Sequence, residues 1–344
     1  MLPLLPLPLL LCPAQVQAAP PAPAAVDREL AFPGHGGFPL KGSVRPGGTH
    51  PYFAVLVAGS GPTDRDWSNP LIRDPRNGTR MESHGGRDFA AWLAARGIGS
   101  LRYDKRFLGS RDPKLDISLD AQVGDIRAAL RAARALPEAK GKRILLVGHS
   151  EGSVLSLVAA QDADALLLLA MPAQPMGRLI QSQVQAQLAA VRAQLPEGSE
   201  AANLAHLEAT LKAIRERKPA PTPGPQVFPG VRALCTGLAA PESQEFLRDT
   251  LDLDPWVLAA RVLVPCAVAW GDRDVQARRP TQVPASFPGR VIDLPGANHV
   301  LKQETRPLEQ LNGGTALSAY GDATPMADLK PLAAWLEGLA QPAR

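Results

Sequence analysis

The chain has 344 residues, a hydrophobic share of 45% and a formal net charge of +4 at pH 7. This length accommodates one large domain with an insertion, and the hydrophobic share is typical of a globular protein. The basic residues are scattered and form no cluster interleaved with aromatic side chains, which argues against a nucleic-acid-binding protein.

The N-terminal segment is apolar and rich in proline and alanine. Residues 1–11 have the length of the apolar core of a signal peptide, and the small residues before Ala19 offer a cleavage site. We therefore expect residues 1–25 to be a signal peptide and linker, and the mature protein to be periplasmic or extracellular. Since no Lys or Arg precedes the apolar core, the alternative is a cytoplasmic protein whose N-terminus is not a working signal. No segment reaches the ~20 apolar residues that span a bilayer, so stable membrane insertion is not expected.

Residues 26–171 alternate between strand-like and helix-like patterns. In chain order, the pattern predicts a hairpin over residues 29–32 and 40–44, a strand over 53–58, a helix through Phe89 and Leu93, a strand over 98–103, a helix through Val123 and Leu130, and strands over 144–147 and 164–171. This alternation predicts a mostly parallel sheet with helices on both faces.

In residues 172–253 the apolar residues follow helical spacing. Apolar residues recur on one face of a first helix at positions 180, 184, 188, 191 and 195, and a second helix is expected over residues 203–217. A proline-rich link over residues 218–230 follows. We expect a helical insertion after the sixth strand, and a helical pair that binds a partner protein is the alternative interpretation.

Residues 254–344 return to the strand and helix pattern. Strands are expected over residues 264–270 and 291–294, and a closing helix is expected from Met326 to Leu339. This segment should complete the sheet that residues 26–171 begin.

The most informative motif is Gly148-His149-Ser150-Glu151-Gly152. It lies between a β-branched and leucine-rich strand and an apolar helical stripe, with a glycine two positions to either side of the serine. This context predicts a nucleophile elbow, in which a strained turn exposes the Ser150 hydroxyl at the end of the sheet. A Gly/Ser-rich connection without chemistry is the alternative.

A serine hydroxyl needs a base to accept its proton and a carboxylate to orient that base. Two histidines follow Ser150: His206 lies in a helix-patterned segment, whereas His299 follows the strand over 291–294, so His299 is the expected base. Asp272 and Asp274 follow the strand over 264–270, and we prefer Asp274 as the acid because it lies later in the turn. Both positions follow the C-terminal ends of strands, where open α/β sheets place their sites.

The expected oxyanion hole has two backbone donors. The first is the N–H of Glu151, directly after the nucleophile, and the second comes from the loop Gly59-Ser60-Gly61, with Ser60 preferred and Gly61 next. A phosphate-binding loop is a weaker interpretation of this segment, because no Gly-Lys-Ser/Thr follows and the next charged residues include acidic ones.

With these residues, Leu101-Arg102-Tyr103-Asp104-Lys105-Arg106 and Gly271-Asp272-Arg273-Asp274 carry a resemblance to the α/β-hydrolase superfamily, in particular its bacterial esterase and serine-aminopeptidase-like branch. The resemblance covers about residues 28–300. It implies an α/β-hydrolase fold with Ser150, Asp274 and His299 as nucleophile, acid and base. It also implies that residues 172–253 form a lid over Ser150. The chain departs from the pattern at Phe107 and Leu108 and at residues 276–279.

We therefore expect a serine hydrolase that cleaves small-molecule carboxylic esters through an acyl-enzyme. The alternatives are an aminopeptidase- or amidase-like hydrolase, with Glu151 or Asp64 facing a substrate amine, and a non-catalytic binding module on the same fold. No HExxH or paired-cysteine spacing is present, so neither a metal nor a cofactor is expected. A bond between Cys235 and Cys266, the acyl chain length and the oligomeric state stay open.

Overall fold

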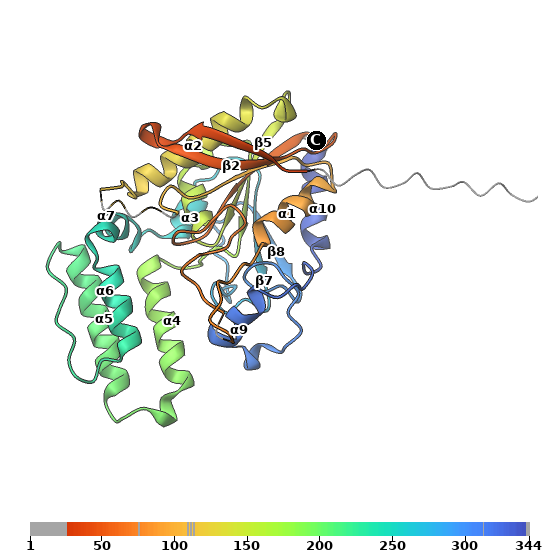
Figure 1. Ribbon diagram of the computed structural model, residues 1–344. Helices are drawn as coiled ribbons and strands as arrows, with labels where there is room; N and C mark the ends of the chain where they lie inside the picture. Colours follow the sequence, from red (N-terminus) through yellow and green to blue (C-terminus); the bar gives the residue numbers. More distant parts are fainter. Residues whose placement is uncertain are drawn as a thin grey trace, which may run out of the picture.

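The computed structural model describes residues 26–74, 76–108, 110, 112, 114–311 and 313–341, so the expected signal peptide at residues 1–25 lies outside the described residues. An eight-stranded sheet has the order β1-β2-β4-β3-β5-β6-β7-β8 (Figure 1). The strands are β1 (Arg28–Pro33), β2 (Pro39–Arg45), β3 (Tyr52–Val57), β4 (Ser100–Tyr103), β5 (Arg143–His149), β6 (Ala165–Leu169), β7 (Cys266–Gly271) and β8 (Arg290–Leu294). β2 pairs antiparallel with β1 and β4, and the remaining pairs are parallel, which confirms the predicted hairpin and mostly parallel sheet.

Strand β5 has an apolar run from Ile144 to Val147, because both of its faces are covered there. Ile144 and Leu146 belong to one apolar core, and Leu145 and Val147 belong to the other. On the first face the core includes residues of α2 (Leu119–Arg134) and α3 (Glu151–Val158). On the second face it includes residues of α1 (Gly85–Ala94) and α10 (Lys330–Ala340). Helices therefore cover both faces of the sheet, as the sequence predicts.

The segment after β6 is helical. It contains α4 (Met176–Ala190), α5 (Ser199–Arg215), α6 (Pro229–Leu238) and α7 (Pro241–Thr250). Figure 1 shows α4, α5 and α6 gathered at one side of the molecule, away from the sheet. The first helix is shorter than its periodicity predicts: α4 ends at Ala190, and Leu195 lies beyond a separate 3-10 turn. Helices α6 and α7 were not among the predicted elements.

Helix α8 (Pro255–Ala259) precedes β7, and α9 (Gly313–Tyr320) and α10 follow β8. The predicted closing helix begins too early, because Met326 forms an isolated β-bridge with Lys302 and α10 starts only at Lys330. Cys235 and Cys266 are both buried and free, so the structure contains no bond between them. Within the described part of the chain, no helix has both the length and the apolar character needed to cross a bilayer.

Candidate active site

Ser150 occupies the turn between β5 and α3 in a backbone conformation that side chains rarely adopt. Its φ is 54° and its ψ is −126°. Gly148 and Gly152 permit this turn: a Cβ on Gly148 would lie 2.5 Å from the carbonyl oxygen of Gly152, and one on Gly152 would lie 2.5 Å from that of Ala58. A strained serine that the surrounding packing holds in place is the geometry of a nucleophile elbow.

His299 and Asp274 form a buried pair. The Nδ1 atom of His299 lies 2.7 Å from Oδ2 of Asp274, and their exposed fractions are 7% and 2%. The other carboxylate oxygen, Oδ1, accepts hydrogen bonds from the backbone N–H groups of Gln276 at 2.7 Å and Ala277 at 3.0 Å. Because each oxygen of Asp274 already has a partner, its orientation toward His299 is fixed.

Asp272, the other acidic residue in this turn, points elsewhere. Its side chain is exposed, and its Oδ1 accepts a hydrogen bond from the backbone N–H of Gly296 at 2.7 Å. It therefore joins the loops that follow β7 and β8. Of the two carboxylates, the structure brings Asp274 to His299.

The loop after β3 approaches the elbow closely. A Cβ on Gly59 would lie 3.1 Å from Cβ of Ser150, and Gly61 has a φ of 71°. Ser60 and Gly61 line the same pocket as Ser150, Glu151 and His299. The predicted nucleophile, base and oxyanion-hole residues therefore line one pocket. Asp274, the predicted acid, lies behind His299 and does not line it.

Glu151 makes a buried ion pair that the sequence analysis missed. Lys105 Nζ donates to Glu151 Oε1 at 2.8 Å, and the two residues are 7% and 8% exposed. Removing one member of a buried pair leaves the other charge without a partner, at a cost of about 3–5 kcal/mol. The pair therefore anchors the first residue of α3 to the segment after β4. No local sequence signal could have paired residues 46 positions apart.

His149 connects the loop after β3 to the loop that carries His299. Its ring stacks on Trp67, with centroids 4.1 Å apart and planes 8° apart, and its Nε2 donates to the backbone carbonyl of His299 at 2.7 Å. Burial lowers the pKa of His149 to about 3, so the ring is neutral near pH 7 and carries its proton on Nε2. This role of His149 was not predicted from the sequence.

We expect a His149→Phe variant to change how stability depends on pH. The unfolded histidine has a pKa of ~6.5 and the folded one about 3, so the unfolded state binds an extra proton between these values. The contribution of His149 to the free energy of unfolding is fully present above pH ~6.5. It falls by about 1.4 kcal/mol per pH unit as the pH decreases toward 3. Phenylalanine can keep the stacking but cannot titrate, so the variant should lose this slope. Urea unfolding at pH 6, 5 and 4 measures it, and equal slopes in both proteins would contradict the account.

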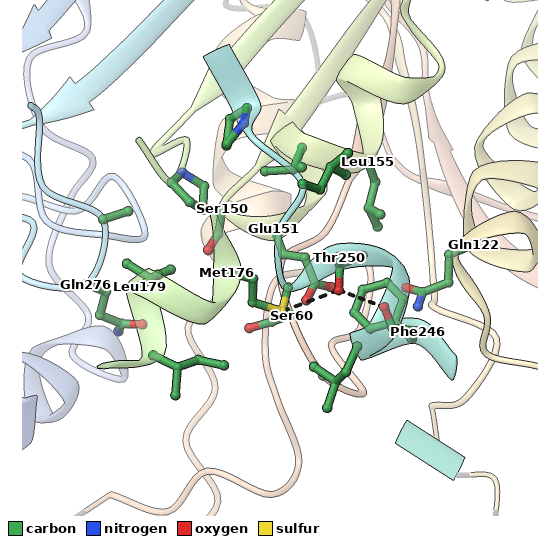
Figure 2. Close-up of a pocket in the computed structure, with 18 of the residues that line it drawn as sticks. Ser60, Gln122, Ser150, Glu151, Leu155, Met176, Leu179, Phe246, Thr250 and Gln276 are labelled. Atoms are coloured by element: carbon green, nitrogen blue, oxygen red, sulfur yellow. Dashed lines mark hydrogen bonds between the residues drawn. The ribbon is translucent and has the colours of Figure 1, made fainter. Parts of the chain in front are cut away.

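The pocket beside Ser150 has a volume of about 390 Å³, within the range of ligand-binding pockets. Figure 2 shows Ser150, Glu151 and Ser60 facing side chains of the helical segment, including Met176, Leu179 and Phe246. The apolar lining from the helices of this segment comprises Met176, Leu179 and Ile180 of α4, Leu238 of α6, and Phe246 and Leu247 of α7. The sequence analysis missed the contributions of α6 and α7, although residues 231, 234, 235 and 238 have apolar side chains at helical spacing.

Comparisons with known proteins agree with this architecture. Esterase EstD of Thermotoga maritima is 28% identical over 244 residues, which are 69% of this chain and 50% of that protein, so the chain spans about half the length of this relative. Polyketide transferase ATR5 of Stachybotrys chlorohalonatus is 40% identical over 75 residues, which are 21% of this chain and 25% of that protein. The hypothetical protein PA2218 of Pseudomonas aeruginosa has a similar fold, with a TM-score of 0.50 and 15% identity over 96% of this chain and 99% of its own.

A family model covers most of the chain. It is that of the alpha/beta hydrolase family, and it matches residues 54–313, a range that includes Ser150, Asp274 and His299. The match extends over the sheet from β3 to β8 and over the helical segment after β6. The chain therefore belongs to the alpha/beta hydrolase family.

Proposed function

We propose that this protein is a serine hydrolase that cleaves carboxylic esters, with Ser150 as nucleophile, His299 as base and Asp274 as acid. The observation that carries the proposal is the buried 2.7 Å contact between His299 Nδ1 and Asp274 Oδ2, at a pocket that Ser150 and His299 both line. The similarity to an esterase supports the choice of substrate class.

In the proposed reaction, Asp274 accepts a hydrogen bond from the Nδ1–H of His299, which fixes the tautomer in which Nε2 is free to act as a base. Nε2 takes the hydroxyl proton of Ser150 as its Oγ attacks the ester carbonyl carbon. His299 then gives this proton to the departing alcohol, which leaves an acyl group on Ser150. A water molecule, deprotonated by His299, attacks this acyl group. As the bond between Oγ and the acyl carbon breaks, His299 returns the proton to Ser150 and the carboxylic acid leaves.

The negative oxygen of the tetrahedral intermediate needs fixed donors. We assign the backbone N–H groups of Glu151 and Ser60, with Gly61 as the next candidate. Glu151 is the first residue of α3, where backbone N–H groups have no acceptor within the helix. Its ion pair with Lys105 supports this role, because it restrains the residue whose N–H would hold the oxyanion.

We propose that residues 172–253 act as a lid. The support is that α4, α6 and α7 all contribute apolar side chains to the pocket beside Ser150. An apolar cover would exclude bulk water and provide binding surface for the apolar part of an ester.

An ester is favoured over an aminoacyl substrate because a free amine would need an unpaired carboxylate. Glu151, a carboxylate that lines the pocket, is already paired with Lys105. Asp64 accepts hydrogen bonds from the backbone N–H groups of Asp66 and Ser68 and forms an ion pair with Arg80. Both carboxylates therefore have partners that a substrate ammonium would have to displace.

A matched panel of ethyl butanoate, N-ethylbutanamide and leucinamide tests this assignment. We expect turnover of ethyl butanoate that depends on Ser150, and turnover of the two amides that does not exceed the Ser150→Ala background. Comparable Ser150-dependent turnover of leucinamide would instead indicate an aminopeptidase. If none of the three is turned over above background and Ser150 is not reactive, the protein is a binding module on this fold.

A further inference from the structure

Two pockets of unequal size meet at Ser150 and His299. The larger has a volume of about 390 Å³ and the smaller about 90 Å³. Ser60, Ser150, Gln276 and His299 line both, so the carbonyl carbon of a substrate attacked by Ser150 would lie at their junction. The two halves of an ester would then extend into different pockets.

The smaller pocket has packed walls. Trp67, Met81 and Tyr320, which line it, are each 5% exposed. Ser83 Oγ donates to the carbonyl of Trp67 at 2.7 Å, and Gln276 Nε2 donates to the hydroxyl oxygen of Tyr320 at 2.7 Å. The first contact holds together two parts of the connection between β3 and α1, and the second joins the loop after β7 to helix α9, so displacing these wall residues would break these hydrogen bonds.

The larger pocket has adaptable and mainly apolar walls. Its contributors from α4, Met176, Leu179 and Ile180, are only partly buried. They can change rotamer more easily than Trp67, Met81 and Tyr320 of the smaller pocket, which are each 5% exposed. This pocket suits an alkyl chain of variable length.

The residues around the base distinguish the two pockets. The departing alcohol must receive its proton from His299, which lines both pockets, and of the two only the smaller is also lined by Val300 and Tyr320, which flank His299. The larger pocket instead extends past Glu151 toward Val154 and Leu155, on the helix that follows the nucleophile. The acyl group, which stays bonded to Ser150 after the alcohol leaves, therefore fits the larger pocket.

We propose that the enzyme selects esters that join a medium-length apolar acyl group to a small alcohol of about one to three carbons. The acyl chain occupies the larger pocket under α4 and α7, and the alcohol occupies the smaller pocket beside Trp67 and Tyr320. This assignment rests on the proposed function, since it takes Ser150 and His299 as nucleophile and base.

Ethyl octanoate and octyl acetate test the assignment, because they are isomers and differ only in which half is long. We expect kcat/KM for ethyl octanoate to exceed that for octyl acetate by at least about tenfold, since even one misplaced methylene costs about that factor. Equal values, or a preference for octyl acetate, would overturn the assignment. Ethyl acetate, which is short on both sides and fits in either orientation, measures hydrolysis that does not depend on which pocket holds which half.

Two substitutions address the pockets separately. Ile180→Trp should reduce the larger pocket and lower the ratio of ethyl octanoate to ethyl acetate turnover by about tenfold. Met81→Ala should enlarge the smaller pocket and raise the turnover of octyl acetate relative to ethyl octanoate. Val191→Trp, at a 40% exposed position just after α4, is the matched control and should leave both ratios unchanged. If Met81→Ala does not fold, the isomer pair and Ile180→Trp still decide the question.

The outcomes separate this inference from the proposed function. Hydrolysis of ethyl acetate with no preference between the isomers would overturn the pocket assignment and leave the serine hydrolase intact. No hydrolysis of any of the three esters, while Ser150 still reacts with a fluorophosphonate, would overturn the substrate class. No hydrolysis and no reaction at Ser150 would overturn both.

Discussion

Replacing Ser150 with alanine is expected to lower the turnover of ethyl esters by about 10⁴-fold or more. The hydroxyl is the atom that forms the acyl-enzyme in the proposed mechanism, and alanine removes it without adding volume. At position 150, alanine has the same unfavourable positive φ as serine. The fold and the thermal unfolding midpoint should therefore change little. Turnover is measured by titration of the released acid.

A Ser150→Ala variant that folds normally and keeps more than about a tenth of the wild-type turnover would contradict the account. Another group would then be the nucleophile. Circular dichroism and thermal unfolding of the variant distinguish this result from a loss of fold.

Asp274→Asn is expected to lower turnover by about 10⁴-fold. Two backbone N–H groups, those of Gln276 and Ala277, hold the Oδ1 side of this residue, so the asparagine oxygen should take that position and its NH₂ group should face His299. Nδ1 of His299 must then accept a hydrogen bond, which moves the ring proton to Nε2. The base is lost because Nε2 can no longer take the proton of Ser150.

Asp272→Asn is the matched control for this substitution. Asp272 uses one oxygen to accept the N–H of Gly296, and asparagine can accept the same bond, so turnover should change by only a few-fold. The reverse ranking of the two variants, measured on the same ester, would assign the orienting carboxylate to Asp272.

The sheet and the elbow follow from local patterns. Ile144 to Val147 form an uninterrupted apolar run, and glycines bracket Ser150 at the distance that the turn requires, so neighbouring residues alone predict β5, the turn and α3. The loops of Asp274 and His299 follow because each comes directly after a strand of the same parallel sheet. The preference for Asp274 over Asp272 agrees with the direction of the two side chains.

The parts that the sequence analysis missed depend on contacts between distant segments. Lys105 meets Glu151, and Trp67 meets His149, only after the sheet has brought their loops together. Helices α6 and α7 are short and each begins with a proline, so they resemble the proline-rich link before them. The predicted closing helix is too long, because Met326 has helical spacing in the sequence but forms a β-bridge with Lys302.

Labelling with a fluorophosphonate tests whether Ser150 is an activated nucleophile. The intact protein should gain the mass of one phosphonyl group, the modified peptide should contain Ser150, and Ser150→Ala should gain none. Asp274→Asn should be labelled far more slowly than the wild type, since its His299 cannot take the serine proton. A modification at another residue, or equal labelling of Ser150→Ala, would contradict the account.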